Sequence, residues 1–374
     1  MSNQTSSEIA LPAVTRPRRI DAARHLLHPR QFRESMTVSG QPFLRNSALA
    51  GLQAALTVLI ALPLVHLSSW SHLIGFASLG ALVALFGRFA ERGKRGGIVL
   101  QCAFWQTVGV LVMSLAAWLG APSIMLLLLL ALLSGTFFFV VTTGRFGPPG
   151  ALIFVFAAGA SMGHVTSASE IIERGLATAI VALLAWLICS LTEAFRHKAN
   201  GDLPFPVEPL RPWNHRVVAA LRIALGSAIA GLAAHVLGAA HPAWAVLGAM
   251  AVMQGSHLHI SMNRALQRTL GTVAGAILVW WILQQEPSVW LIIAILAGLQ
   301  FATEVIIGSN YGLGQILVTP MALLMSYLAA PYAASHTMVP ERVLDTLLGA
   351  AIGIVLAVLC SSLDDRRHLA NRHL

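Results

Sequence analysis

The chain consists largely of apolar runs of about 20 residues that are separated by short polar turns. A run of this length, folded as an α-helix, spans the hydrocarbon core of a bilayer. Twelve runs can be placed, at residues 46–67, 70–87, 97–120, 122–141, 148–163, 174–195, 217–238, 243–256, 265–284, 288–308, 311–330 and 342–362. Because backbone groups in lipid must be paired internally, the pattern predicts an all-α polytopic membrane protein with about twelve transmembrane helices.

Composition and charge agree with a membrane protein. Hydrophobic residues make up 56% of the 374 residues and charged residues only 10%. The formal net charge of +9 would suit a nucleic-acid partner in a soluble protein. Here the basic residues lie in the turns between apolar runs, where the positive-inside rule explains them, so we expect no nucleic-acid partner.

The distribution of basic residues predicts the orientation. With the N-terminus inside, all but two of the 24 Lys and Arg residues lie on the cytoplasmic side. The two exceptions are Arg174 and Arg342, each of which follows an acid, Glu173 or Glu341, and we expect two outer ion pairs there, with a gate at the outer exit as the alternative. Both termini are therefore predicted to be cytoplasmic.

The two halves of the chain resemble each other and predict two parallel six-helix repeats. The expected organisation is a basic N-terminal segment, a first repeat, a cytoplasmic linker, a second repeat and a cytoplasmic tail, at residues 1–45, 46–195, 196–216, 217–362 and 363–374. An even number of helices per repeat places both halves in the same orientation around an axis along the membrane normal. We expect a central pathway between two halves that are related in this way.

Residues 241–275 combine a short apolar run, a basic segment and a glycine-spaced helix. The run is too short to cross a bilayer comfortably, and Arg264 and Arg268 follow it in an expected cytoplasmic turn. We expect these two arginines to place positive charge at the cytoplasmic mouth or to fix the topology. Gly271 and Gly275, four residues apart, predict a close approach to another helix.

Three blocks resemble the fusaric acid resistance-like, or aromatic acid exporter, family. They are NRALQRTLGTVAGA at 263–276, NYGLGQILVTPMALL at 310–324 and ERVLDTLLGAAIG at 341–353. The resemblance implies a bacterial inner-membrane secondary active exporter of organic anions, aromatic carboxylic acids in particular, that is driven by protons. Distant similarity to plant malate channels leaves a passive anion channel as the alternative. A membrane enzyme or lipid-handling protein is a third alternative, although no catalytic constellation and no Walker A sequence is present.

Segments that are short or interrupted at matching places in two repeats indicate a transport site. The fifth run of each half opens on an irregular turn, and we expect substrate-binding residues there, namely Arg145, Phe146, Asn310, Tyr311 and Thr319. The Thr319–Pro320 pair is expected to interrupt its helix and to free backbone groups for an anion. Arg145 and Asn310 are expected to face one shared cavity. Tight turns and a topology-setting Arg145 are the alternative.

Two acids are candidates for proton coupling. Glu304 lies in an apolar run, and we expect Arg268 or Arg145 near it, with a static ion pair as the alternative. Asp345 either takes part in coupling, caps its helix or pairs with Arg342. Besides organic anions and protons, membrane lipids are the expected partners, and homo-oligomerisation is left open. We expect no metal and no cofactor, because the HxH pair at His257 and His259 lacks a nearby carboxylate or cysteine.

Overall fold

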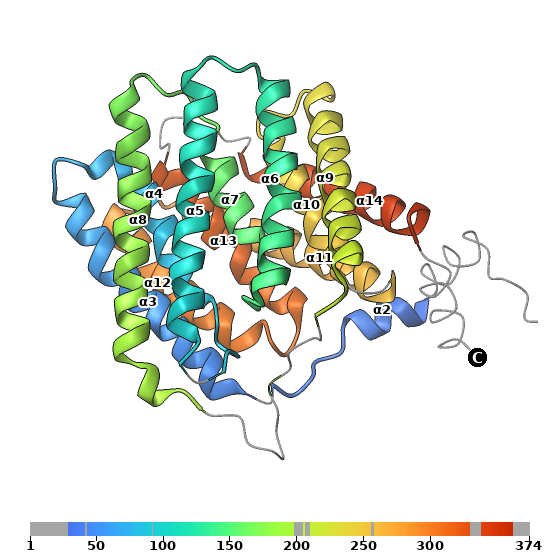
Figure 1. Cartoon of the computed structure of the whole chain (residues 1–374), viewed down its shortest axis with the longest axis horizontal. Coiled ribbons are helices and arrows are strands. Elements are labelled where there is room, and N and C mark those ends of the chain that lie inside the picture. Colours follow the sequence, from blue (N-terminus) through green and yellow to red (C-terminus); the bar gives the residue numbers. More distant parts are fainter. Residues whose placement is uncertain are drawn as a thin grey trace, which may run out of the picture.

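The computed structural model describes residues 29–361, apart from 42, 92, 198–204, 206–209, 256–257 and 330–337. These described residues form thirteen α-helices and three short 3₁₀-helices and contain no strand, which confirms the all-α class (Figure 1). The expected tail at 363–374 and most of the segment 1–45 and the linker 196–216 lie outside the described residues.

The first half of the chain contains α2 (Pro29–Ser35), α3 (Leu44–His66), η1 (Ser71–Leu73), α4 (Ile74–Ala81), η2 (Leu82–Leu85), α5 (Arg95–Trp118), α6 (Ser123–Gly144), α7 (Leu152–Ala160), α8 (Ala168–Leu191) and η3 (Glu193–Phe195). The second half contains α9 (Trp213–Val236), α10 (Ala243–Met253), α11 (Leu258–Leu283), α12 (Val289–Ile306), α13 (Tyr311–Ala329) and α14 (Met338–Leu359).

Nine of the helices in the described part of the chain are long and apolar enough to cross a membrane. They are α3, α5, α6, α8, α9, α11, α12, α13 and α14. The remaining apolar runs form shorter elements, namely η1–α4–η2, α7 and α10. The chain is thus a multi-pass membrane protein in which short helices are packed between full-length ones.

Helices of one half pack against counterparts in the other half in a reciprocal pattern. The first long helix of each half, α3 or α9, lies along the fourth helix of the other half, α12 or α6. Within each half, the third element packs against the sixth, as α5 with α8 and α11 with α14. Reciprocal packing of this kind is what two six-element repeats would produce, and the repeat arrangement itself remains a prediction.

Two sequence expectations are wrong, one about the start of α11 and one about an interruption of α13. The helix expected from residue 265 begins at Leu258, so Arg264 and Arg268 lie within α11 rather than in a turn. Leu258, Ser261, Ala265 and Arg268 recur at helical spacing and are all buried, which explains why the helix extends through the basic segment.

The helix α13 is also unbroken, with Pro320 inside it. Proline removes the hydrogen bond to the carbonyl group four residues earlier, that of Ile316. A Cβ atom added to Gly275 would lie 2.6 Å from the Ile316 oxygen, so α11 and α13 are in direct backbone contact here. Of the two helices formed by the fifth run of each half, the shortened one is α7 of the first half, which has only nine residues.

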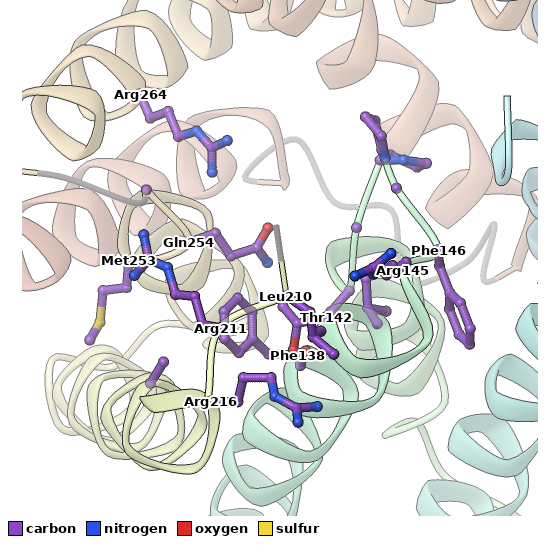
Figure 2. A pocket seen from close by; sticks show the side chains of 18 of the residues that line it. Phe138, Thr142, Arg145, Phe146, Leu210, Arg211, Arg216, Met253, Gln254 and Arg264 are labelled. Atoms are coloured by element: carbon purple, nitrogen blue, oxygen red, sulfur yellow. Dashed lines mark hydrogen bonds between the residues drawn. The ribbon is translucent and has the colours of Figure 1, made fainter. Parts of the chain in front are cut away.

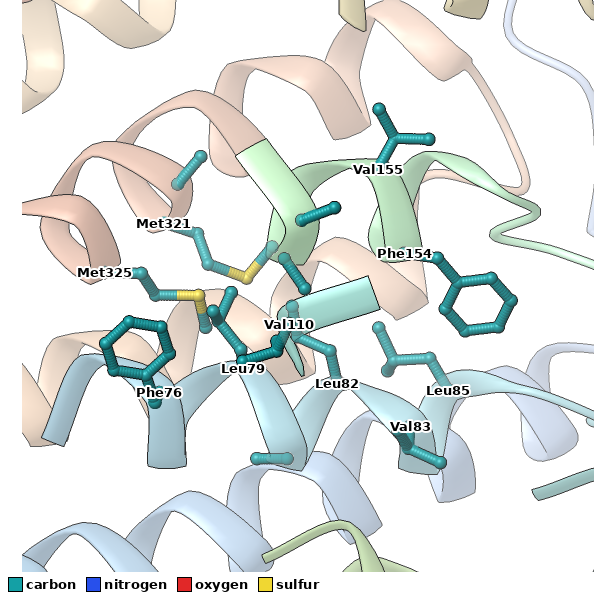
Figure 3. Packing of buried hydrophobic residues seen from close by; sticks show 14 of the residues in the cluster. Phe76, Leu79, Leu82, Val83, Leu85, Val110, Phe154, Val155, Met321 and Met325 are labelled. Atoms are coloured by element: carbon teal, nitrogen blue, oxygen red, sulfur yellow. The ribbon is translucent and has the colours of Figure 1, made fainter. Parts of the chain in front are cut away.

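The buried centre is formed by the short elements together with parts of long helices such as α13. Figure 3 shows Met321 and Met325 of α13 beside Phe76 and Leu79 of α4, and all four side chains are buried. Every residue of α4 is buried, although it is too short to span a bilayer. The long helices shield α4, which therefore lies inside the protein rather than against lipid.

Candidate functional site

A cavity of about 800 Å³, here called the large cavity, lies among the short elements and the helices α10 to α14. Along α13 its lining runs from Tyr311 to Met325, which is roughly 21 Å at 1.5 Å per residue. Its charged lining residues are Glu34, Arg88, Arg264, Arg268, Glu304 and Arg342. Among the described residues of the lining, cations therefore outnumber anions, four to two, and the rest of that lining is mostly apolar.

Arg342 is the most deeply buried cation of the large cavity. Its side chain is in the first turns of α14, and only 2% of the residue is exposed. The guanidinium group lies over the indole ring of Trp244, 3.9 Å from the ring centroid. Trp244 is in turn stacked on Phe156. Nε and Nη1 of Arg342 are buried and have no hydrogen-bond partner among the described residues, so these two donors are left unpaired.

Close contact between α10 and α14 places Arg342 beside Trp244. A Cβ atom on Gly248 of α10 would lie 3.0 Å from the Thr346 oxygen of α14. Glycine at this position lets the two helices approach closely, and Trp244 lies one turn before it. The short helix α10 thus positions the aromatic ring that supports the buried cation.

Arg268 and Tyr311 adjoin Arg342. Nη1 of Arg268 donates to the Tyr311 hydroxyl group at 3.2 Å, while its buried Nε has no partner among the described residues. Arg268 and Arg342 are close enough for their charges to repel each other, and Asp345 is the acid in range of Arg342. Neither arginine forms a salt bridge with a described residue. Two incompletely compensated buried cations form a place where an anion would be stabilised.

Glu304 forms a buried ion pair with Arg88 in the wall of the large cavity. The expected partners, Arg268 and Arg145, are wrong. Arg88 follows η2 and reaches Glu304 because α3, which packs on η2, also packs along α12. A Cβ atom on Gly51 of α3 would lie 3.1 Å from Cβ of Glu304, so this glycine makes room for the acid.

The side chain of Asn310 is bonded to the backbone of two segments. Its amide group donates to the carbonyl oxygens of Ser35 and Thr37, at 3.2 and 2.9 Å. Its side-chain oxygen accepts from the backbone N–H groups of Gly312 and Leu313, at 2.8 and 3.1 Å. These bonds cap α13 and attach the end of α2 and the segment after it to the edge of the large cavity. The amide group is thereby fully used, although Asn310 lines the cavity.

The other predicted residues are dispersed. Thr319 lines no part of either cavity, and its hydroxyl group donates to the Gln315 oxygen. Asp345 is buried, and its Oδ2 atom has no hydrogen-bond partner among the described residues. It does not line the large cavity.

Arg145 and Phe146 line a second cavity of about 470 Å³, here called the small cavity (Figure 2). Arg145 caps α6 in a left-handed conformation with a φ of 53°. Phe146 is packed inside, with 1% exposed. The expectation that Arg145 and Asn310 face one cavity is therefore wrong. The two cavities share a wall formed by Phe89, Pro148, Pro149, Gln254 and Arg264.

The expected outer ion pairs are not formed. Arg174 pairs with Glu170 at 2.6 Å, and Glu341 contacts His241 at 2.8 Å. Adjacent residues on a helix point about 100° apart, so Glu341 cannot readily face Arg342, whereas residues four apart can pair. The sequence singles out Arg342 as an arginine near the start of an apolar helix, on the side where the positive-inside rule disfavours it, but it does not indicate the cavity or the contact with Trp244.

Comparison with known proteins gives two matches and one negative result. Residues 229–356 match the family described as fusaric acid resistance protein-like. A stretch of 143 residues is 32% identical to the uncharacterized membrane protein YvaC of Bacillus subtilis (strain 168), covering 38% of this chain and 23% of that protein. No solved structure matches. The matched residues include Trp244, Arg268, Tyr311 and Arg342, so the candidate site lies in the part of the chain that is similar to this family.

Proposed function

We propose that this protein is a secondary active exporter of organic anions, aromatic carboxylic acids in particular, that uses the proton gradient across the bacterial inner membrane. The observation that carries the proposal is the pair of buried cations, Arg268 and Arg342, in one cavity without a carboxylate in salt-bridge distance among the described residues. The family match of residues 229–356 supports a transport role for this domain.

The surroundings of the two cations suit a planar carboxylate. Free guanidinium N–H groups would bind the carboxylate oxygens, since charge-assisted bonds from arginine are strong and directional. Phe89, Phe156, Met321 and Met325 line the same cavity and would pack against an apolar ring. Tyr311 would keep its hydrogen bond with Arg268 or shift it to the ligand.

The Arg88–Glu304 pair is the proposed coupling element. A carboxylate that loses its arginine partner in a buried setting takes up a proton more readily. In the carrier that has released its anion outside, separation of this pair would let Glu304 take up a proton from that side. Re-formation of the pair on the inner side would release the proton, so that a proton enters as an anion is exported. Asp345, beside Arg342, is the second candidate for this role.

The proposed architecture places the cavity between two parallel six-helix repeats, with both termini cytoplasmic. The reciprocal packing of α3 on α12 and of α9 on α6 supports the repeats. The basic residues of the turns support the orientation.

Flux measurement in proteoliposomes tests the proposal. The purified protein would be reconstituted and loaded with labelled benzoate, with and without an imposed pH gradient. Uphill movement of benzoate that depends on the pH gradient is the expected result. Flux that only follows the electrochemical gradient of benzoate itself would indicate an anion channel, and absence of flux for a panel of aromatic and aliphatic carboxylates would contradict an anion transport function.

A further inference from the structure

The small cavity carries an unusual concentration of positive charge that the proposed export function does not use. Its lining contains five arginines and a histidine, namely Arg145, Arg211, His215, Arg216, Arg222 and Arg264. No acidic residue lines the cavity in the described part of the chain. The arginines come from the segment after α6, the residues before α9, α9 itself and α11, so distant parts of the sequence converge here.

Most of these arginines have no side-chain partner in the described part of the chain. Arg145, Arg211, Arg222 and Arg264 form no side-chain hydrogen bond or salt bridge with a described residue. Arg216 donates to the Thr143 hydroxyl group at 2.6 Å. Glu91, which interacts electrostatically with Arg145, is itself paired with Lys94. Arg145 and Arg211 are exposed, whereas Arg222 and Arg264 are half-buried, and a bound anion would relieve the repulsion between these like charges.

A buried donor adds a second indication of a ligand. Nε2 of Gln254, at the end of α10, is inaccessible to solvent and has no hydrogen-bond partner among the described residues. Figure 2 shows Arg264 extending towards Gln254 on one side of the small cavity, and Arg145 facing it from the other. A donor of this kind is costly to leave unpaired, so the arrangement favours an acceptor group in the cavity.

The position of the small cavity suits an interfacial ligand. Arg216 lies over the rings of Trp213 and Phe139, at 5.4 and 5.7 Å from their centroids. The Trp213 side chain is largely exposed at the start of α9. Tryptophan at a helix end is typical of the membrane–water interface, where phosphate groups of lipids lie.

We propose that the small cavity is a binding site for a phosphate ester group, distinct from the carboxylate site in the large cavity. A phosphate monoester carries about −1.5 to −2 charges and several acceptor oxygens, which matches several convergent guanidinium groups. Arg145, Arg211, Arg222 and Arg264 bind the phosphate oxygens, and Gln254 donates from the wall. The occupant is the headgroup of an anionic phospholipid or a soluble phosphate ester.

Binding to the purified full chain in detergent tests this site without any transport assay. Two probes separate the sources, dioctanoyl phosphatidic acid as a lipid headgroup and glycerol 3-phosphate as a free ester. Arg211→Gln/Arg222→Gln removes two charges that line only the small cavity. Arg33→Gln/Arg45→Gln is the matched control, because it removes two exposed arginines outside both cavities.

We expect saturable binding that is weakened roughly tenfold or more in Arg211→Gln/Arg222→Gln and is unchanged in the control. Binding of the acylated probe alone identifies a lipid headgroup, and equal binding of both probes identifies a soluble ester. No saturable binding of either probe, or equal weakening in both double variants, would overturn the proposal. If Arg211→Gln/Arg222→Gln does not fold, Arg145→Gln alone replaces it, with the same expected direction and the same contrary result.

Discussion

The guanidinium group of Arg342 lies over the indole ring of Trp244 at 3.9 Å from the ring centroid, and both residues are almost completely buried. A desolvated contact of this kind is worth about 2 kcal/mol, and tryptophan is the best aromatic partner. The ring stabilises the positive charge of Arg342 without forming hydrogen bonds to the guanidinium N–H groups. A carboxylate in the same place would stabilise the charge and also occupy those donors.

Changes at Trp244 should therefore affect anion binding in a graded way. Trp244→Phe keeps an aromatic face and should weaken benzoate binding slightly, whereas Trp244→Leu removes the face and should weaken it roughly tenfold. Isothermal titration calorimetry would measure the benzoate affinity of the wild type, Trp244→Phe and Trp244→Leu, which should fall in that order. Equal affinity in all three would show that the ring does not position Arg342 for a ligand.

The Arg88–Glu304 pair gives a prediction about coupling. We expect Glu304→Gln to abolish benzoate export against its gradient and to spare flux down the gradient, because an amide group cannot exchange the proton. Flux in proteoliposomes with and without a pH gradient measures both. Unimpaired export driven by the pH gradient would exclude Glu304 from coupling.

A static ion pair predicts a different outcome for the same variant. Removing one partner of a buried pair costs about 3–5 kcal/mol, since the other charge is left uncompensated. Glu304→Gln would then lower the thermal stability and all flux together. Arg88→Met/Glu304→Gln, which removes both charges, would recover stability, and thermal unfolding of the wild type and these two variants separates the two roles.

The contact between α11 and α13 predicts a contrast between two glycines. Gly275→Ala should lower the unfolding temperature, because the added Cβ atom lies 2.6 Å from the Ile316 oxygen and overpacking costs about 1–3 kcal/mol. Gly298→Ala in α12 is the matched control, since a Cβ atom there meets nothing within 4 Å. Its helix should be unchanged or slightly more stable. A similar effect of both substitutions would contradict the close contact.

The orientation predicts which sites are labelled from outside. Ser169 is exposed near the start of α8, and Asn214 is exposed near the start of α9. In a background without Cys102, Cys189 and Cys360, Ser169→Cys in intact cells should react with an impermeant thiol reagent, and Asn214→Cys should react only after permeabilisation. The opposite pattern would reverse the orientation.

The helical class could be predicted from the sequence because apolar run length follows directly from bilayer thickness. The close approach at Gly271 and Gly275 is confirmed, since added Cβ atoms at both positions would clash with α13. The boundary of α11 was missed because Arg264 and Arg268 were expected to require water. Arg268 is instead buried, where it donates to Tyr311 and lies beside a cavity, so the helix can extend through it.

The cavity lining could be predicted only in part. Five of the candidate residues named from the sequence line the large cavity, namely Arg264, Arg268, Glu304, Asn310 and Tyr311. Pairing was harder to predict, because it depends on which helices meet. Arg88 reaches Glu304 through the packing of α3 on η2 and α12, and Trp244 reaches Arg342 through the packing of α10 on α14. These contacts join residues far apart in the sequence, and no local pattern encodes them.

The most direct test of the carboxylate site is the affinity for benzoate of the wild-type protein and of Arg342→Met, measured by isothermal titration calorimetry in detergent. Methionine keeps an apolar side chain in place of the arginine stem and removes the charge and its donors. Benzamide, which has the same ring but no charge, is the control ligand, and Arg45→Gln is the control variant. We predict that Arg342→Met loses roughly tenfold to 100-fold in benzoate affinity, since a hydrogen bond to a charged group contributes about 1.5–3 kcal/mol. Wild-type affinity in a folded Arg342→Met protein, or equal binding of benzoate and benzamide by the wild type, would contradict the assignment of this site.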